Sequence, residues 1–389
     1  MTGDDSAQRH PPRDEELRAR LAEELTANGD LRSDAWRTAF RRVPRHMFVP
    51  SFFRPEGPWG RLEHIDGGDL DEHDAWLNSV YSDDTLYTQV NDAGSVLSSS
   101  TSPGLMALML EALDIADGMQ ILEIGTGTGY NAALLCERLG SARVTSIDID
   151  RELIATARER LASADYFPHL DACDGLEGYQ ANAPYDRILS TVAVPAIPVP
   201  WIRQVRRGGR ILANLYRELG AGALALLTAR GDFAEGRFLA EYGGFMPIRA
   251  IQHPPVTSLL HAAEGECDER ETQISGGVLD DPSFAFFAAF FVPAQRLGYA
   301  PHGQPEEFWL LSGDGSWARQ TRGPEGGLVA CQHGPRRLWD ALERSHSVWV
   351  SLASPPRREF GLTVTTDGRH ALWCSRDVAA RWTLEPGRA

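Results

Sequence analysis

The sequence contains no lysine: all 38 basic residues among its 389 positions are arginine. The absence of lysine excludes Schiff-base catalysis and phosphate binding by a P-loop lysine. The arginines are outnumbered by 54 acidic residues, which gives a formal net charge of −16. Nucleic acid is therefore not expected as a partner, because binding to phosphates needs clustered cations.

Cysteine and long apolar runs are also scarce. The five cysteines are far apart and include no CxxC pair, so we expect reduced thiols, with neither a disulfide framework nor a zinc site. The longest apolar run, Phe284–Val292, is too short to span a bilayer, and the N-terminus has no secretory signal. The expected protein is cytoplasmic, without a membrane contact, and most simply a monomer. The cysteines are Cys136, Cys173, Cys267, Cys331 and Cys374.

Strand and helix patterns alternate along the middle of the chain, which predicts an α/β fold with a mostly parallel sheet. Residues 1–15 are polar and are expected to be disordered, and two short helices are expected between Glu16 and Phe40. The expected later helices are Leu105–Leu113, Asn131–Leu139 and Glu152–Leu161. The expected strands are Gln120–Ile124, Arg143–Ile147, Tyr185–Thr191 and Arg210–Leu215, then an antiparallel hairpin of Ala223–Ala229 and Arg237–Tyr242.

The last third of the chain has a different pattern, and residues 251–389 are expected to form a smaller α+β domain that recognises the substrate peptide. Six of the ten tryptophans lie at or after position 309, and most of them are expected in a core. One helix is expected at Arg336–Ser345, and the run Phe284–Val292 is expected to be buried, with a peptide-docking surface as the alternative. Two hairpins are expected around Asp-Gly turns, formed by Phe308–Leu311 with Trp317–Gln320 and by Gly361–Thr365 with His370–Cys374.

A glycine-rich segment between an expected strand and an expected helix is the sharpest motif. Its spacing is G-x-G-x-G, and Tyr130 occupies the position of the third glycine of the dinucleotide fingerprint G-x-G-x-x-G. A dinucleotide is therefore disfavoured, and a single nucleoside without a pyrophosphate is favoured. A glycine-rich turn of some other α/β fold remains the alternative. The residues expected to bind the cofactor here are Glu123, Gly125, Thr126, Gly127, Thr128 and Gly129.

Acidic residues follow the next two strands. Asp148 ends the strand that follows the glycines, where a carboxylate can accept hydrogen bonds from both ribose hydroxyls, and the adjoining Ile149 is also expected to bind the cofactor. A helix-capping role is the alternative for Asp148. Asp174 and Gly175 follow a further short strand, where an acceptor could meet an adenine amino group. Together these residues predict S-adenosylmethionine as the cofactor.

Several further blocks resemble the protein-L-isoaspartate O-methyltransferases, between about residues 31 and 250. The resemblance implies a Rossmann-like class I methyltransferase fold with a mostly parallel seven-stranded sheet over residues 16–250, and an O-methyltransferase activity. The blocks are Arg42–Pro50 (RVPRHMFVP), Tyr81–Asp84 (YSDD), Thr101–Met109 (TSPGLMALM), Pro184–Ile188 (PYDRI), Ala193–Pro198 (AVPAIP), Gly208–Ile211 (GGRI) and Phe245–Ile248 (FMPI).

The chain also departs from this family. Thr101 stands where the family has its active-site serine, and Leu86–Leu97 replaces a shorter glycine-rich stretch that helps to shape the isoaspartate pocket. Together with the long C-terminal extension, these departures resemble a specialised branch that methylates one aspartate of a modified, macrocyclic ribosomal peptide. In that branch the ester cyclises to an aspartimide. Graspetide, lanthipeptide and lasso substrates all remain open.

Thr101 is the expected catalytic residue. Methyl transfer to a carboxylate needs no general base, because the carboxylate is already ionised near neutral pH. The expected role of the Thr101 hydroxyl is to donate to one carboxylate oxygen and so aim the other. An N-cap or a plain loop position is the alternative for Thr101, with Ser100 and Ser102 as substitutes.

The remaining candidates are weaker. His64–Asp74 (HIDGGDLDEHD) matches no EF-hand or zinc spacing, so a solvated loop without metal is expected, and His46 is expected to be structural. The function expected is methyl-esterification of an aspartate side chain in a modified ribosomal precursor peptide, followed by aspartimide formation. The alternatives are a general isoaspartate repair methyltransferase and a cofactor-binding regulator without turnover.

Overall fold

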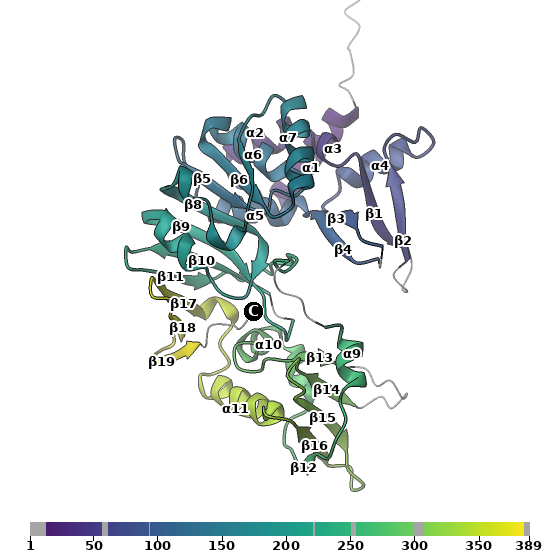
Figure 1. Cartoon of the computed structure of the whole chain (residues 1–389), viewed down its shortest axis with the longest axis vertical. Helices are drawn as coiled ribbons and strands as arrows, with labels where there is room; N and C mark the ends of the chain where they lie inside the picture. The colour runs from purple at the N-terminus through teal and green to yellow at the C-terminus, as the bar shows by residue number, and fades with distance from the viewer. Residues whose placement is uncertain are drawn as a thin grey trace, which may run out of the picture. The chain divides into compact units, whose positions relative to one another are not determined.

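The computed structural model describes residues 13–56, 61–92, 94–220, 222–249, 254–298 and 307–384 (Figure 1). Its contacts divide the chain into two compact units, which are described separately below. Unit 1 comprises residues 1–191 with 204–210, and unit 2 comprises residues 192–203 with 211–389. No helix in these described ranges is both long and apolar enough to cross a membrane.

Unit 1 begins with helices that pack through an apolar face. The two helices expected near the N-terminus are confirmed as α1 (Arg13–Asn28) and α2 (Asp34–Arg42). The first three residues of α1 were expected to be disordered and are helical, whereas residues 1–12 lie outside the described residues. Ser33 caps α2 by accepting the Trp36 N–H, and Leu17, Leu21 and Leu25 recur at helical spacing and are buried. Two further helices of unit 1 are α3 (Arg45–Phe48) and α5 (Pro103–Ala112).

A four-stranded antiparallel sheet follows, in the order β2-β1-β3-β4. The stretch His64–Asp74, expected to be a loop, instead ends one strand, makes a turn and begins the next helix. Leu86–Leu97 forms most of a hairpin whose second strand runs into Thr101. The elements are β1 (Ser51–Glu56), β2 (Arg61–Asp66), α4 (His73–Val80), β3 (Leu86–Val90) and β4 (Val96–Ser100).

The centre of unit 1 is a parallel sheet in the order β8-β5-β6-β7, which confirms the expected α/β fold. Its central strand β5 is buried at all four positions, as an apolar strand covered on both faces should be. The strands are β5 (Ile121–Ile124), β6 (Val144–Asp148), β7 (His169–Ala172) and β8 (Tyr185–Val194), the last of which runs into unit 2. The accompanying helices are α6 (Tyr130–Leu139) and α7 (Arg151–Ser163), with short 3₁₀ turns at Ser141–Arg143, Gly175–Glu177 and Gln180–Asn182.

Unit 2 contains antiparallel strands in the order β19-β18-β17-β11-β10. The expected hairpin after residue 223 is confirmed, although its second strand begins earlier than the sequence indicated. The sheet was expected to end at this hairpin with seven strands, but β17 pairs with β11 and three further strands are added. The elements are α8 (Val199–Gln204), β9 (Val205–Leu215), which both units share, β10 (Ala223–Ala229), β11 (Phe233–Phe238), β17 (Phe360–Thr365), β18 (His370–Cys374) and β19 (Asp377–Leu384).

A second sheet of unit 2 has the order β12-β16-β15-β14-β13. Both Asp-Gly hairpins expected in this part of the chain are confirmed. Phe284, Phe286 and Phe287 are almost fully buried, which confirms the expected core segment. The elements are α9 (Val256–His261), β12 (Asp268–Glu271), a 3₁₀ turn (Gly276–Asp280), α10 (Pro282–Ala288), β13 (Gln295–Leu297), β14 (Phe308–Leu311), β15 (Trp317–Arg322), β16 (Leu328–His333), α11 (Leu338–Ser351) and a 3₁₀ turn (Arg357–Glu359).

Two observations in this part of unit 2 correct the sequence expectations. Cys267 and Cys331 form a disulfide, although no disulfide was expected. Their separation of 64 positions gave no hint of pairing, but the antiparallel register of β12 with β16 brings them together. The boundary expected at residue 250 also fails to separate the sheets, because β17 pairs with β11 across it. A substrate-recognition role for residues 251–389 stays a prediction.

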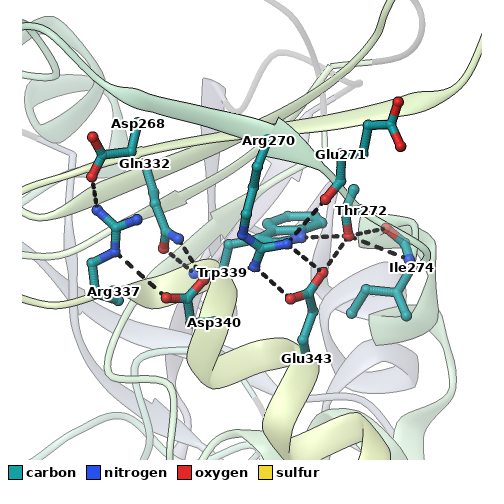
Figure 2. A network of polar contacts seen from close by, with 10 residues as sticks. All are labelled: Asp268, Arg270, Glu271, Thr272, Ile274, Gln332, Arg337, Trp339, Asp340 and Glu343. Carbon is teal, nitrogen blue, oxygen red and sulfur yellow. Dashed lines mark hydrogen bonds and ion pairs between the residues drawn. The ribbon is translucent and has the colours of Figure 1, made fainter.

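A polar network holds α11 against β12 (Figure 2). The Arg270 guanidinium donates to Asp340 at 2.6 Å and to Glu343, while Thr272 accepts a hydrogen bond from the Trp339 indole at 2.9 Å. These contacts join residues about 70 positions apart, and they pair the Arg270 guanidinium with two carboxylates of α11. The network is structural.

Candidate active site

The glycine-rich segment forms a tight turn between β5 and α6. Gly125, Gly127 and Gly129 have φ angles of 99°, 52° and 90°, which other residues rarely adopt. The N–H of Gly125 donates to the carbonyl of Ile147 at 2.8 Å, so the turn is fixed to the end of the neighbouring strand β6. The geometry therefore requires the glycines that the sequence places there.

Glu123 lies behind this turn. It is completely buried, and its two carboxylate oxygens accept hydrogen bonds from Asn131 on α6, at 2.6 Å, and from Ser146 on β6. Because the Ser146 proton is used in this way, the Thr126 hydroxyl must be the donor in its 2.6 Å contact with Ser146. Burial raises the pKa of Glu123 to about 7, although the hydrogen bonds from Ser146 and Asn131 act in the opposite direction and lower it. Glu123 was expected among the cofactor contacts, but this arrangement gives it a supporting role.

Asp148 ends β6 next to the glycine turn. One carboxylate oxygen accepts the N–H of Gly127 at 3.0 Å, and the other accepts the N–H of Asp150 at 3.1 Å. Helix capping, the alternative considered for Asp148, is performed by Asp150, which accepts the N–H groups of Glu152 and Leu153. A carboxylate has about four acceptor positions, so Asp148 keeps capacity for ribose hydroxyls.

The third cofactor element follows β7. Asp174 is exposed and accepts the N–H of Leu176 at 2.9 Å, and Gly175 packs so closely that a Cβ there would lie 2.6 Å from Ile124. Ile149, directly after β6, is 50% exposed and offers an apolar surface at the same place. Because β5, β6 and β7 are parallel, these residues share the carboxyl edge of the sheet, where α/β folds bind ligands. The turn, the carboxylates and the exposed apolar side chain fit an adenosine moiety.

The second strand of the β3–β4 hairpin approaches the cofactor turn. A Cβ placed on Gly127 would lie 3.7 Å from the carbonyl oxygen of Ser99 and 3.9 Å from the Ser98 hydroxyl. Thr101 follows two residues after Ser99. The structure thus brings the candidate catalytic segment and the cofactor turn together, although 26 positions separate Thr101 from Gly127.

The three candidate hydroxyls differ in their surroundings. Ser100 is 3% exposed, and its hydroxyl accepts hydrogen bonds from the Arg45 guanidinium at 3.3–3.4 Å. Ser102 precedes α5, but its side chain makes no capping hydrogen bond. The Thr101 hydroxyl has no hydrogen-bond partner among the described residues, and Thr101 is only half-buried. Of the three, Thr101 and Ser102 keep a hydroxyl that a substrate could use.

Sequence reasoning missed two residues here. Asp83 accepts the N–H of Gly104 at 2.6 Å and so holds the start of α5, while burial raises the pKa of its carboxyl. Arg45 is buried, and its guanidinium donates to the carbonyl of Thr101 and to the carbonyl of Asp84 on a separate segment. Both residues lie in blocks that carry the family resemblance, but only the tertiary structure shows their partners. His46 contacts the Tyr81 hydroxyl at 2.8 Å and packs on Trp76, in keeping with the structural role expected for it.

Comparison with known proteins places this site in context. The family model described as Protein-L-isoaspartate(D-aspartate) O-methyltransferase matches residues 61–220. Two similar proteins named protein-L-isoaspartate O-methyltransferase come from Thermococcus sibiricus and Pyrobaculum neutrophilum. The first is 34% identical over 207 residues, covering 51% of this chain and 80% of the relative. The second is 30% identical over 233 residues, covering 59% and 98%.

A solved structure titled protein-L-isoaspartate O-methyltransferase has a TM-score of 0.55 at 20% identity. The match covers 92% of this chain and 99% of that protein. The likeness of fold therefore extends well beyond residue 250, into the part of the chain that the sequence set apart as an addition.

Proposed function

Since the chain belongs to the protein-L-isoaspartate O-methyltransferase family, we propose that it methylates an aspartate side chain held in a preorganised, macrocyclic ribosomal peptide. At the coarser level it is an S-adenosylmethionine-dependent carboxyl O-methyltransferase that acts on proteins or peptides. The proposal concerns the substrate, the residues that hold it and the fate of the ester.

The β3–β4 hairpin is the observation that carries the proposal. This hairpin occupies the stretch where the sequence departs from the family, and its second strand leads into Thr101 while passing over Gly127. A changed segment at that place alters what can enter the site without altering the cofactor turn. A hairpin that differs from the family and lies beside a cofactor turn that does not differ supports the proposal of a methyltransferase with a specialised substrate.

In the proposed mechanism, S-adenosylmethionine supplies the methyl group. Asp148 would hold the ribose, and the Thr101 hydroxyl would donate to one oxygen of the substrate carboxylate so that the other faces the methyl group. Because the substrate carboxylate is already ionised near neutral pH, neither residue would have to accept a proton. Positioning of this kind can supply roughly 7–11 kcal/mol of the barrier.

The ester then reacts within the peptide. The backbone nitrogen of the next residue attacks the ester carbonyl, loses its proton and expels methanol, and the product is a five-membered aspartimide. This step needs no further group from the enzyme, and it is fastest where the next residue is glycine, because crowding is least there.

Three peptides assayed side by side with labelled cofactor test the proposal: a macrocyclic aspartyl peptide, its linear precursor and an unrelated isoaspartyl hexapeptide. The macrocycle has already lost much conformational entropy, so we expect it to be methylated fastest and the hexapeptide slowest. Mass spectrometry should show the gain of a methyl group and then the loss of methanol. A faster hexapeptide would contradict the proposal.

The second candidate function is general repair of isoaspartyl residues. It is favoured by the names of relatives that are 34–35% identical over 78–80% of their own length. A repair enzyme must accept any flexible isoaspartyl segment and reject ordinary aspartate, so it would give the reverse order of the three peptides.

A further inference from the structure

Arg45 is a buried charge that the mechanism above does not use. We propose that Arg45 is a positioning residue for methyl transfer, which fixes the Thr101 segment relative to the cofactor turn. The inference rests on the proposed role of Thr101, but it does not depend on which peptide is the substrate.

The Arg45 guanidinium is 0% exposed and donates to backbone carbonyls from two separate segments. On one side it binds the turn after α4, through the carbonyls of Val80 at 2.9 Å, Ser82 at 3.1 Å and Asp84 at 3.1 Å. On the other side it binds the end of β4, through the carbonyls of Ser100 at 3.3 Å and Thr101 at 3.1 Å. The residue proposed to aim the substrate is therefore held directly by Arg45.

The same side chain also faces the cofactor half of the site. Its guanidinium carbon lies 5.7 Å from the centre of the Tyr130 ring, and Tyr130 begins α6 directly after Gly129. Tyr130 is itself held by edge and tilted contacts with Phe40 and Phe48. Arg45 thus connects the Thr101 segment with the helix that starts at the cofactor turn.

The chemistry of this position requires an arginine. Burial lowers the pKa of Arg45 to about 10, with Tyr130, Asp83, Tyr81 and Asp84 opposing the change, so the side chain stays charged at neutral pH. The two Nη groups of Arg45 reach five carbonyls in different directions and its Nε reaches the Ser100 hydroxyl, as the planar, five-donor fork of a guanidinium allows. A lysine ammonium has three donors at one point and cannot reach both segments.

Arg187 provides a matched control in the same unit. It is 6% exposed, and its guanidinium donates to the carbonyls of Leu113 at 2.6 Å, Asp114 at 2.8 Å and Asp186 at 2.9 Å. Arg187 pairs with Ile121, the first residue of β5, so it lies at the amino edge of the sheet, away from the cofactor turn. Loss of either guanidinium leaves backbone carbonyls without their donor. Of these two arginines, Arg45 is the one that donates to the Thr101 segment.

The test compares Arg45→Lys with Arg187→Lys in the full chain, each saturated with S-adenosylmethionine and assayed at the same interval below its own Tm. We expect both variants to lose thermal stability. Only Arg45→Lys should lose kcat, by roughly tenfold or more, because a small displacement at the reacting centre is costly, while KM for the cofactor stays within about twofold. Equal kcat losses in the two variants, or an unchanged kcat in Arg45→Lys, would overturn the inference.

A double-mutant cycle with Thr101→Val separates this inference from the proposed function. If Arg45 acts through Thr101, the two kcat losses will be far from additive, and additive losses would overturn the inference. A fully active Thr101→Val would instead overturn the proposed role of Thr101. If Arg45→Lys does not fold, Ser100→Ala removes the hydroxyl that accepts from both Nε and Nη2 of Arg45, and it should lower kcat about threefold without coupling to Arg187→Lys. Unchanged kcat in that variant would contradict the inference.

Discussion

The cofactor edge and the Thr101 segment are built in opposite ways. The cofactor edge is held by neighbours along the chain or on adjoining parallel strands, such as Gly127 with Asp148, 21 positions apart. The Thr101 segment is held by a hydrogen bond from Arg45, which is 56 positions away on α3. The comparison teaches that the cofactor site can persist while the segment proposed to meet the substrate is reshaped.

The difference also explains where the chain departs from its family. The cofactor turn needs positive φ angles and close packing, as at Gly175, and these leave little freedom for substitution. The β3–β4 hairpin is an antiparallel pair with two register shifts, and among its described residues the positive φ of Gly94 lies in the loop and not in the strands. Changes in substrate preference can therefore accumulate in the hairpin without loss of cofactor binding.

Replacing Asp148 should give the largest effect. Asp148→Ala removes two charge-assisted ribose hydrogen bonds, each worth roughly 1.5–3 kcal/mol, so cofactor affinity should fall at least about a hundredfold. Asp150→Ala is the matched control at the same strand end, and it should cost about 1 kcal/mol of stability through the lost cap of α7 while leaving affinity intact. Calorimetric titration measures both, and an unchanged affinity in Asp148→Ala would remove this residue from the site.

Glu123 should make the cofactor half of unit 1 sensitive to pH. Its folded-state pKa of about 7 lies above the ordinary value of 4.5, so its ionisation destabilises the folded chain as the pH rises through this interval. Glu123→Gln is neutral at every pH. Between about pH 4.5 and 7 the wild type should therefore lose roughly 3 kcal/mol of stability relative to this variant. Denaturant unfolding across that range measures the difference, and a difference independent of pH would refute the assignment.

Much of the cofactor edge could be predicted from the sequence because its signals are local. The glycine spacing, the carboxylates after successive strands and the alternation of strand and helix all lie within short windows, and the parallel order of β5, β6 and β7 follows from them. Even there, the sequence could not separate Glu123 from the residues that can meet a ligand. Its burial depends on Asn131 and Ser146, which come from two other elements.

The rest could not be predicted because it depends on distant partners. Nothing in the sequence around Arg45 indicates that its guanidinium donates to five backbone carbonyls. Nothing around Cys267 indicates that Cys331 is its disulfide partner. The addition of β17 to β11 likewise joins segments more than 120 positions apart, so the sheet could not be counted from the alternation of strands and helices alone. The sequence indicates strands near β11 and at β17 and leaves their pairing unknown, but it indicates neither α3, which carries Arg45, nor the strands β12 and β16 beside the two cysteines.

The most direct test of this account is the rate of methyl transfer by Thr101→Val, which keeps the shape of the side chain and removes only the hydroxyl. Thr26→Val, on α1 and outside the site, is the control for loss of a threonine hydroxyl, because the Thr26 hydroxyl donates to the carbonyl of Ala22. The account predicts that kcat of Thr101→Val falls at least tenfold, about 1.4 kcal/mol, with cofactor affinity unchanged, while Thr26→Val stays within about twofold of the wild type. A Thr101→Val variant with the wild-type rate would contradict the account.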